Sequence, residues 1–234
     1  MRHVFAAVAL GCVCVGGAAL ADDVATSPVV LELFTSQGCS SCPPADALLT
    51  ELADNDDVIA LALHVDYWDY IGWKDIFANP AFTARQKQYA HSAGKRMVYT
   101  PQMIIGGEDT VVGSQPMEVA DMIKTHQDKG MPVDLSMTRD GDQVTVSAPA
   151  APLAEPAILQ LVRYIPQRTV EVKRGENAGR IMTYSNIATD WTPVTEWDGT
   201  EAFEMSFDVI GQDPVVAILQ MQDGGPIIGA ARVR

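Results

Sequence analysis

Two cysteines, Cys39 and Cys42, are the residues of this sequence with the clearest chemistry. They enclose two serines in a Cys-Ser-Ser-Cys motif. Thiols at this spacing can exchange disulfides with other molecules, form a fixed structural disulfide, or bind copper(I) together with His64 or Met103, because copper(I) prefers soft sulfur ligands. Structural zinc needs four ligands, and the sequence has no second Cys-x-x-Cys motif or closely spaced histidine pair. We therefore expect no zinc site.

The other two cysteines, Cys12 and Cys14, lie in a segment that is typical of a secretory signal. Residues 1–21 have a positive start, an apolar run and an Ala-Leu-Ala ending. We expect cleavage before Asp22 and not an uncleaved membrane anchor, the alternative that the length of the apolar run leaves open. The mature protein then keeps only the Cys-Ser-Ser-Cys pair and lies in the periplasm or outside the cell, where disulfides persist.

The charge of the chain excludes one class of partner. The sequence has 30 acidic against 16 basic residues, a formal net charge of -14, and 47% of its residues are hydrophobic. This composition is that of a globular protein, and the negative charge repels nucleic acid. We expect no nucleic-acid partner.

The elements that position the motif alternate between strands and helices over residues 22–130. A strand, a helix and a second strand follow one another around the motif, which implies a parallel pair with a helical crossover. Pro43 opens the first helix, since proline is tolerated in a first turn. The expected strands are 29–34, 58–64, 102–107 and 110–113, and the later helices are 80–91 and 116–128.

From Met131 onward the sequence predicts strands and turns only, which is typical of an antiparallel sandwich. We expect an all-β, sandwich-like domain over 131–234. About eight candidate strands are separated by turn residues, at 135–137, 144–147, 158–164, 169–172, 181–184, 203–209, 215–221 and 227–233.

The order of elements in residues 22–130, with the cysteines between the first strand and first helix, resembles a thioredoxin fold. A narrower resemblance is to a secreted bacterial family described only as a domain of unknown function, family 1223. The motifs that carry it are Glu32 to Asp46, His64 to Tyr70, Gly72 to Asp75, Tyr99 to Gln102 and Gly175 to Arg180. It implies an α/β thioredoxin-like domain with a central mixed sheet, then the strand-rich extension, without an established substrate. Gly38 and Ser40-Ser41 depart from ordinary thioredoxins, which have Trp and Gly-Pro there.

The resemblance implies roles for the motif and for one proline. Cys39 is expected to be the exposed nucleophile at the amino end of the helix, where N–H groups and the helix dipole stabilise a thiolate. Cys42 is expected to resolve the mixed disulfide and to pair with Cys39 in the oxidised form. Thr100 and Pro101 would be the threonine and cis-proline that position an extended substrate.

Other candidate residues have two interpretations each. Glu32, seven residues before Cys39, would lie beneath the dithiol and transfer protons, or point to solvent or pair with a lysine. Tyr67 and Trp68 would line a substrate groove or cap the core. His64, at the end of a strand near Asp66, is expected to be half-buried and hydrogen-bonded. The basic stretch from Lys173 to Arg180 is expected to be a solvated turn between strands, with carboxylate or partner binding as the alternative.

These observations favour a periplasmic or secreted thiol-disulfide oxidoreductase without a cofactor or bound metal. Its substrate would be a protein or small thiol or disulfide, and a membrane protein is a candidate redox partner. Two alternatives stay open: a copper(I) metallochaperone, and a non-catalytic binding module in which the disulfide only fixes the helix start.

Overall fold

The structure, a computed structural model, describes residues 27–234. The expected signal peptide, residues 1–21, lies outside the described residues. The helices are α1 (Pro43–Ala53), α2 (Pro80–Ser92) and α3 (Pro116–Lys129), with short 3-10 helices η1 (Asp69–Ile71) and η2 (Gln222–Gly224). The strands are β1 (Val29–Thr35), β2 (Val58–His64), β3 (Gln102–Ile105), β4 (Asp109–Val112), β5 (Ser136–Asp140), β6 (Gln143–Ala148), β7 (Ala157–Glu171), β8 (Ile181–Trp197), β9 (Phe203–Asp208), β10 (Val215–Met221) and β11 (Ile227–Val233).

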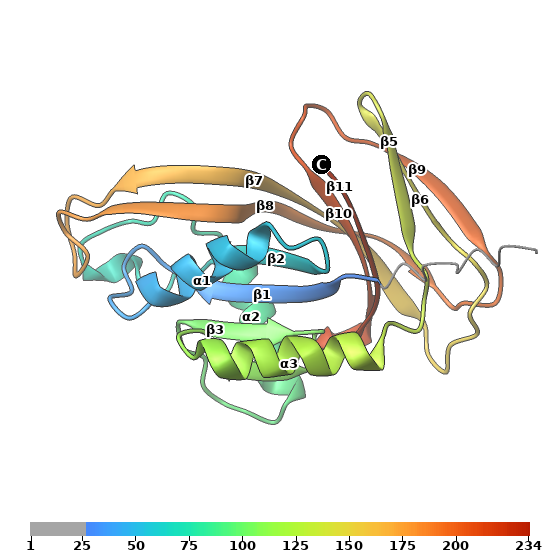
Figure 1. Ribbon diagram of the computed structural model, residues 1–234, viewed down its shortest axis with the longest axis horizontal. Helices are drawn as coiled ribbons and strands as arrows, with labels where there is room; N and C mark the ends of the chain where they lie inside the picture. Colours follow the sequence, from blue (N-terminus) through green and yellow to red (C-terminus); the bar gives the residue numbers. More distant parts are fainter. Residues whose placement is uncertain (1–26) are drawn as a thin grey trace, which may run out of the picture.

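The molecule is a mixed α/β fold built on one large sheet (Figure 1). The sheet has eight strands in the order β11-β10-β7-β8-β2-β1-β3-β4. β1 runs parallel to β2, with α1 as the crossover, and antiparallel to β3, which forms a hairpin with β4. The predicted parallel pair and hairpin are therefore confirmed.

β1 lies in the middle of this half of the sheet and is buried on both faces. Leu31 and Leu33 share a core with residues of α1 and α3, such as Leu49. Val30 and Phe34 point to the opposite face, where they share a core with residues of α2. Alternate residues of β1 thus face different helices, because successive side chains of a strand point to opposite faces.

The second half of the chain contains strands and turns, as predicted, but it does not form a sandwich of its own. β8 pairs in parallel with β2, through Ala62 and Ile187, so β7, β8, β10 and β11 extend the first sheet. Only β5, β6 and β9 form a second, three-stranded sheet, whose residues share a core with β7, β10 and β11. The residue boundary at 130 stays a prediction.

β7 and β8 are longer than the sequence indicated. The strands expected at 158–164 and 169–172 are both part of β7, which continues through Pro166. β10 pairs only with Ala157 to Arg163, so Pro166 lies where this edge of β7 is free. A proline is tolerated there because the missing N–H removes no bond to β10.

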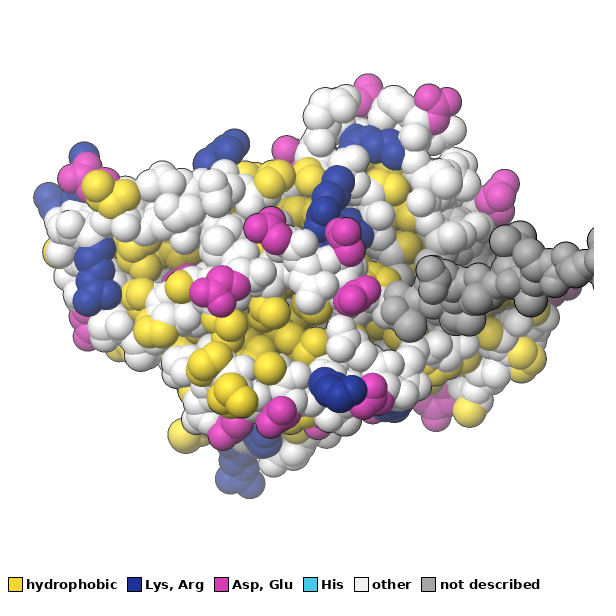
Figure 2. All heavy atoms as spheres, viewed as in Figure 1, with side chains coloured by type: hydrophobic (Ala, Val, Ile, Leu, Met, Phe, Trp, Pro, Cys, Tyr) yellow, Lys and Arg dark blue, Asp and Glu magenta, His cyan; other side chains and the backbone are white. Residues whose placement is uncertain are grey.

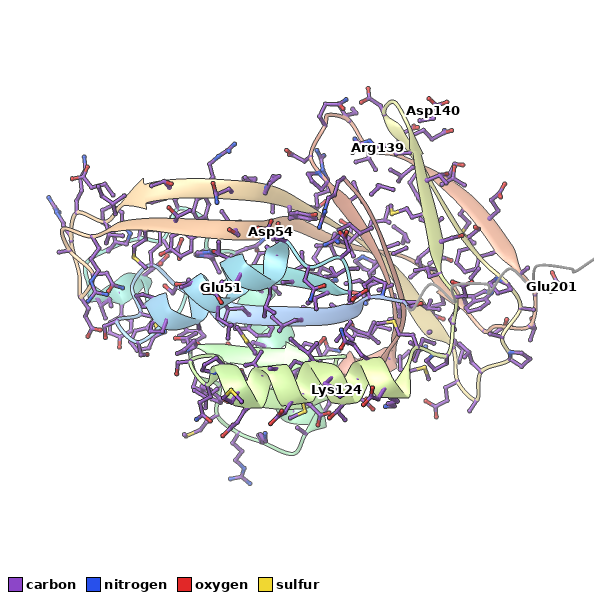
Figure 3. All side chains as sticks on the ribbon, in the orientation of Figure 1. Glu51, Asp54, Lys124, Arg139, Asp140 and Glu201 are labelled. Atoms are coloured by element: carbon purple, nitrogen blue, oxygen red, sulfur yellow. A yellow bond between two sulfur atoms is a disulfide. The ribbon has the colours of Figure 1, made fainter. Side chains whose placement is uncertain are left out.

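Exposed charged side chains lie on α1 and α3 and next to them. Figure 3 shows Glu51 on α1, Asp54 just after its end and Lys124 on α3, and all three residues are exposed. Figure 2 shows acidic and basic side chains interspersed on this face, with apolar side chains visible between α1 and α3. None of the helices within residues 27–234 is long and apolar enough to cross a membrane.

Candidate functional site

The Cys-Ser-Ser-Cys motif lies between the end of β1 and the start of α1. Cys39 and Cys42 form a disulfide, as predicted, with their Cα atoms 5.4 Å apart. Cys42 is the N-cap residue of α1, and its carbonyl oxygen accepts hydrogen bonds from the N–H groups of Ala45 (2.8 Å) and Asp46 (3.1 Å). The disulfide therefore stands at the positive end of a helix dipole, where a thiolate is stabilised once the bond is broken.

The expected exposure of Cys39 is wrong. Cys39 is 1% exposed and Cys42 is fully buried, whereas the two serines between them are exposed. The loop before α1 is covered because other segments pack on it: a Cβ atom built on Gly38 would lie 3.2 Å from the side chains of Ile71 and Trp68. A substrate thiol can reach the disulfide only if this packing shifts.

The loop that precedes β3 lies next to the motif. The Thr100–Pro101 peptide bond is cis. Ser41 Oγ lies 3.4 Å from Cys39 Sγ and donates a hydrogen bond to the Thr100 carbonyl oxygen at 3.4 Å. Trp68 Nε1 donates to Thr100 Oγ1 at 2.7 Å. The structure thus brings together Cys39, Thr100 and Trp68. The role of Thr100 and Trp68 in positioning a substrate stays a prediction.

Aromatic side chains continue from this contact to the surface. Trp68 stacks on Tyr70 with ring centroids 6.5 Å apart, and Tyr70 is 81% exposed. Tyr67 and Trp68 are partly buried against the core on the α2 face, and Tyr67 donates to Gln86 Oε1 at 3.2 Å. Burial raises the pKa of Tyr67 to about 12. The two residues therefore cap the core and also border the loop at Thr100.

Glu32 does not lie beneath the dithiol. It points to the α2 face of the sheet, with Val30 and Phe34, whereas α1 covers the other face. The fully buried carboxylate accepts two hydrogen bonds from Arg85, at 2.6 and 2.9 Å, and a third from the Tyr89 hydroxyl. The position expected for Glu32 is wrong because β1 turns alternate side chains to opposite faces.

The carboxyl group on the dithiol side is Asp46, four residues after Cys42 in α1. Its side chain is buried, and Oδ1 accepts a hydrogen bond from Thr35 Oγ1 at 2.7 Å. Burial raises its pKa to about 7, against a partial lowering by the Thr35 hydrogen bond and by His64. Asp46 therefore exchanges a proton near neutral pH.

A second buried acid lies close enough to affect Asp46. Asp75 Oδ2 lies 2.7 Å from His64 Nδ1 and accepts a hydrogen bond from the backbone N–H of Gln37 at 2.8 Å. His64 is fully buried, so the expectation of a half-buried histidine is wrong. Asp66, two residues on, instead accepts a hydrogen bond from Thr83 at 2.6 Å.

The turn between β7 and β8 also reaches the motif. Asn177 Nδ2 donates hydrogen bonds to the carbonyl oxygens of Gln37 (3.0 Å) and Cys39 (2.9 Å), and Asn177 is fully buried. Figure 1 shows that this turn lies at the end of the sheet where α1 begins. The expected solvated turn is thus only partly present: Lys173 and Arg174 are exposed, but Asn177 is part of the site.

Buried polar atoms without partners gather at this site. Within residues 27–234, four buried side-chain atoms have no hydrogen-bond partner: Gln37 Nε2, Asp46 Oδ2, His64 Nε2 and Asn177 Oδ1. All four residues contact the loop before α1 or take part in the interactions just described. Such atoms are costly in a core and are common at functional sites, so they mark this cluster as a candidate for proton chemistry.

Asp46, Asp75 and Asn177 were not predicted from the sequence to have a role, although each lies in a motif that carries the family resemblance. Asp46 could have been found from its position: it lies three residues before Leu49, on the face of α1 that packs against the sheet. Asp75 and Asn177 have no comparable local signal, because their partners are distant in sequence.

The copper(I) alternative needs His64 or Met103 beside the two cysteines, and these two side chains lie in different environments. His64 Nδ1 is taken by Asp75, and Met103 is buried in the core under α1 and α3. In the part of the chain that the structure describes, no group of three or more His, Cys, Asp or Glu side chains could hold a metal ion.

Comparisons with known proteins give a family and a fold. Residues 30–220 match the family of proteins of unknown function DUF1223. The crystal structure of protein AGR_C_4864 from Agrobacterium tumefaciens is similar, with 32% identity, a TM-score of 0.79, and coverage of 89% of this chain and 94% of that one. HBP35 of Porphyromonas gingivalis has 18% identity and a TM-score of 0.59, with coverage of 89% and 75%, which shows similarity of fold alone. No curated protein matches the chain.

Proposed function

Since the chain belongs to the DUF1223 family of proteins of unknown function, we propose its activity from the geometry of its own site: thiol-disulfide exchange at Cys39 and Cys42. The observation that carries this proposal is the Cys39–Cys42 disulfide at the amino end of α1, with Ser41 between Cys39 Sγ and the Thr100 carbonyl oxygen. An ordinary structural disulfide needs neither the helix dipole nor a buried acid beside it.

We propose that residues 22–130 are thioredoxin-like within the larger sheet. The strand order β2-β1-β3-β4, the crossover through α1, and helices on both faces of these strands support this assignment. The cis peptide bond before Pro101, beside the motif, agrees with the resemblance seen in the sequence.

The proposed reaction balances over two exchange steps. A substrate thiolate attacks Cys39 Sγ, the Cys39–Cys42 bond breaks, and its electron pair goes to Cys42 Sγ, which takes a proton. A second substrate thiolate then attacks the substrate sulfur of the mixed disulfide, and Cys39 leaves as a thiolate. The substrate is oxidised to a disulfide and the protein is reduced by two electrons; the reverse sequence reduces a substrate disulfide.

Asp46 is the proposed proton-transfer group for Cys42. The two residues are four positions apart at the start of α1, a spacing that places side chains on the same face of a helix. A pKa of about 7 allows Asp46 to hold or release a proton at neutral pH. This role replaces the one expected for Glu32.

A redox titration of the mature protein in glutathione buffers tests the proposal. The thiol state of Cys39 and Cys42 is read by alkylation and mass spectrometry. We expect a reversible two-electron transition between about -270 and -120 mV, the range of redox-active proteins of this fold. A disulfide that resists reduction below about -300 mV would overturn the proposal and favour a structural role.

We further propose that the protein acts in the periplasm or outside the cell, after removal of residues 1–21. The pattern of that segment and the disulfide in the structure support this location. A membrane protein would then restore the redox state of the dithiol. Cell fractionation with mass spectrometry of the mature amino terminus tests the location: an uncleaved chain in the cytoplasm would contradict it.

A further inference from the structure

The buried asparagine of the β7–β8 turn, Asn177, makes its side-chain hydrogen bonds outside the turn, which a structural role within the turn does not require. Asn177 lies 138 residues after Cys39 in the sequence, yet both of its side-chain hydrogen bonds go to the backbone of the motif loop, at Gln37 and Cys39. Its Oδ1 atom is buried without a partner in the described chain. The side chain thus uses both amide hydrogens on the loop that carries the nucleophile.

The turn that carries Asn177 is closed by hydrogen bonds of its own backbone. The N–H of Gly179 donates to the Val172 carbonyl oxygen at 2.7 Å, and the N–H of Val172 donates to the Arg180 carbonyl oxygen at 2.9 Å. At Gly175, φ is +78°, and an added Cβ would lie 3.2 Å from Trp73 Cβ. Glycine allows this close approach.

The same loop is held from a second direction. Trp73 Nε1 donates to Gln37 Oε1 at 2.7 Å, and the backbone N–H of Gln37 donates to Asp75 at 2.8 Å. The Gln37 carbonyl oxygen is left for Asn177, and the Cys39 carbonyl oxygen accepts from Asn177 in addition to the backbone N–H of Cys42 at 3.3 Å. If Asn177 lost its amide group, both carbonyl oxygens would lose the bond that ties them to the β7–β8 turn.

We propose that Asn177 is a positioning residue of the dithiol site: it holds residues 37–39 in the conformation that buries the Cys39–Cys42 disulfide. The β7–β8 turn thereby sets how readily a thiol reaches and reduces the disulfide. This inference rests on the proposed function, and it assigns to the carboxyl-terminal strands a part in the reaction.

The test compares Asn177→Ala with Asn186→Gly. Asn186 is also buried and donates from Nδ2 to a backbone carbonyl oxygen, that of Ala60 at 2.9 Å, but it does not touch the motif. Glycine suits this position because φ is +47°. Both variants lose one buried amide, so general destabilisation affects both.

Two readouts separate positioning from stability. We expect a phosphine to reduce the disulfide of Asn177→Ala about tenfold faster than that of the unchanged protein, and the glutathione equilibrium to shift about tenfold toward the dithiol. Asn186→Gly should stay within about twofold of the unchanged protein in both measurements. Equal rates and equilibria for all three proteins would overturn the inference.

The outcomes also separate this inference from the proposed function. If the unchanged protein titrates reversibly and Asn177→Ala behaves identically, only the role of Asn177 fails. If the unchanged disulfide does not titrate, the oxidoreductase proposal fails, while the phosphine rates still test Asn177.

Hydrogen exchange of the unchanged protein decides the question if Asn177→Ala does not fold. On reduction, the amides of residues 37–39 and of the turn 172–180 should lose protection together, because Asn177 joins them. Loss of protection in residues 37–39 without any change in the turn would contradict the inference.

Discussion

Asp46 combines burial with a position in the first turn of α1. A carboxyl group whose pKa is raised in the folded state, here to about 7 from 3.8, binds more protons when folded than when unfolded between those two values. The folded state is therefore most favoured at low pH, and this contribution is lost as the pH rises from about 4 to about 7.

Asp46→Asn is expected to remove this pH dependence. The free energy of unfolding of the unchanged protein should fall, relative to that of the variant, by roughly 2–4 kcal/mol between pH 4.5 and 7.5. Urea unfolding of both oxidised proteins at the two pH values measures the difference. Parallel pH profiles would show that Asp46 stays ionised in the folded protein.

Glu32 and Arg85 form a buried ion pair that is expected to stabilise the fold. Glu32 is fully buried and Arg85 is 12% exposed, and the guanidinium also lies 3.8 Å from the centre of the Trp191 ring. Arg85→Met leaves the carboxylate without its counterion, so we expect a loss of about 3–5 kcal/mol in the free energy of unfolding.

The matched control for Arg85 is the double variant Glu32→Gln with Arg85→Met, which removes both charges. It should recover more than half of the lost free energy of unfolding, and the redox equilibrium of the disulfide should be unchanged in both variants. A shifted redox equilibrium in Arg85→Met would instead show that the Glu32–Arg85 pair affects the disulfide.

At the scale of elements, α1, β4 and the loop before β3 meet at a glycine. A Cβ atom built on Gly113 would lie 3.0 Å from Ala45 Cβ, 3.2 Å from Leu33 Cδ1 and 3.3 Å from Pro101 Cβ. Its neighbours are buried side chains in the core below the motif, so they have little room to move. An added methyl group would therefore require these neighbours to shift by a few tenths of an ångström.

Gly113→Ala is expected to lower the free energy of unfolding by about 1–3 kcal/mol, because the added methyl group must separate α1 from Pro101. Urea unfolding measures this cost, and alkylation rates of the reduced protein show whether the motif shifts with it. Ser114→Ala, at the exposed neighbouring position, should change neither quantity. A Gly113→Ala protein as stable as the original would mean that α1 and β4 can move apart freely.

Local pattern was enough to predict the α-helices and strands of residues 27–130, but not the 3-10 helix η1. β2, for example, is an unbroken apolar run and has the predicted bounds, Val58–His64. The course of β7 was not predictable in the same way, because Pro166 indicates a break unless the free edge of the strand is known. Pairing between β2 and β8 depends on residues far apart in sequence, which a local pattern does not contain.

The residues of the candidate site likewise differ in whether local pattern reveals them. Cys39, Cys42 and Thr100–Pro101 were found because their residue types and order indicate their chemistry. Asp46 was missed although its spacing from Leu49 places it on the buried face of α1, because an acidic residue in the first turn of a helix is usually exposed. Glu32 was misplaced because the sequence does not say which face of β1 is covered by α1.

The two halves of the molecule share the eight-stranded sheet and the core on its α2 face. The core on the α2 face contains Phe34 and Phe82 from the first half and Tyr164 and Ile218 from the second. Gln220, in β10, donates to the Tyr89 hydroxyl and accepts from Arg85. The second half therefore completes the core that supports β1, in addition to contributing Asn177 to the site.

A fragment of residues 27–130 tests whether the first half can fold without the second. We expect no cooperative unfolding transition, because β2 would lose its partner β8 and the α2 face would lose the apolar side chains from β7 and β10. Urea unfolding followed by circular dichroism, with residues 27–234 as the control, measures this. A fragment that unfolds cooperatively and keeps the redox equilibrium of the longer chain would show that the boundary at 130 separates two independent domains, and that neither β8 nor Asn177 is needed for the dithiol site.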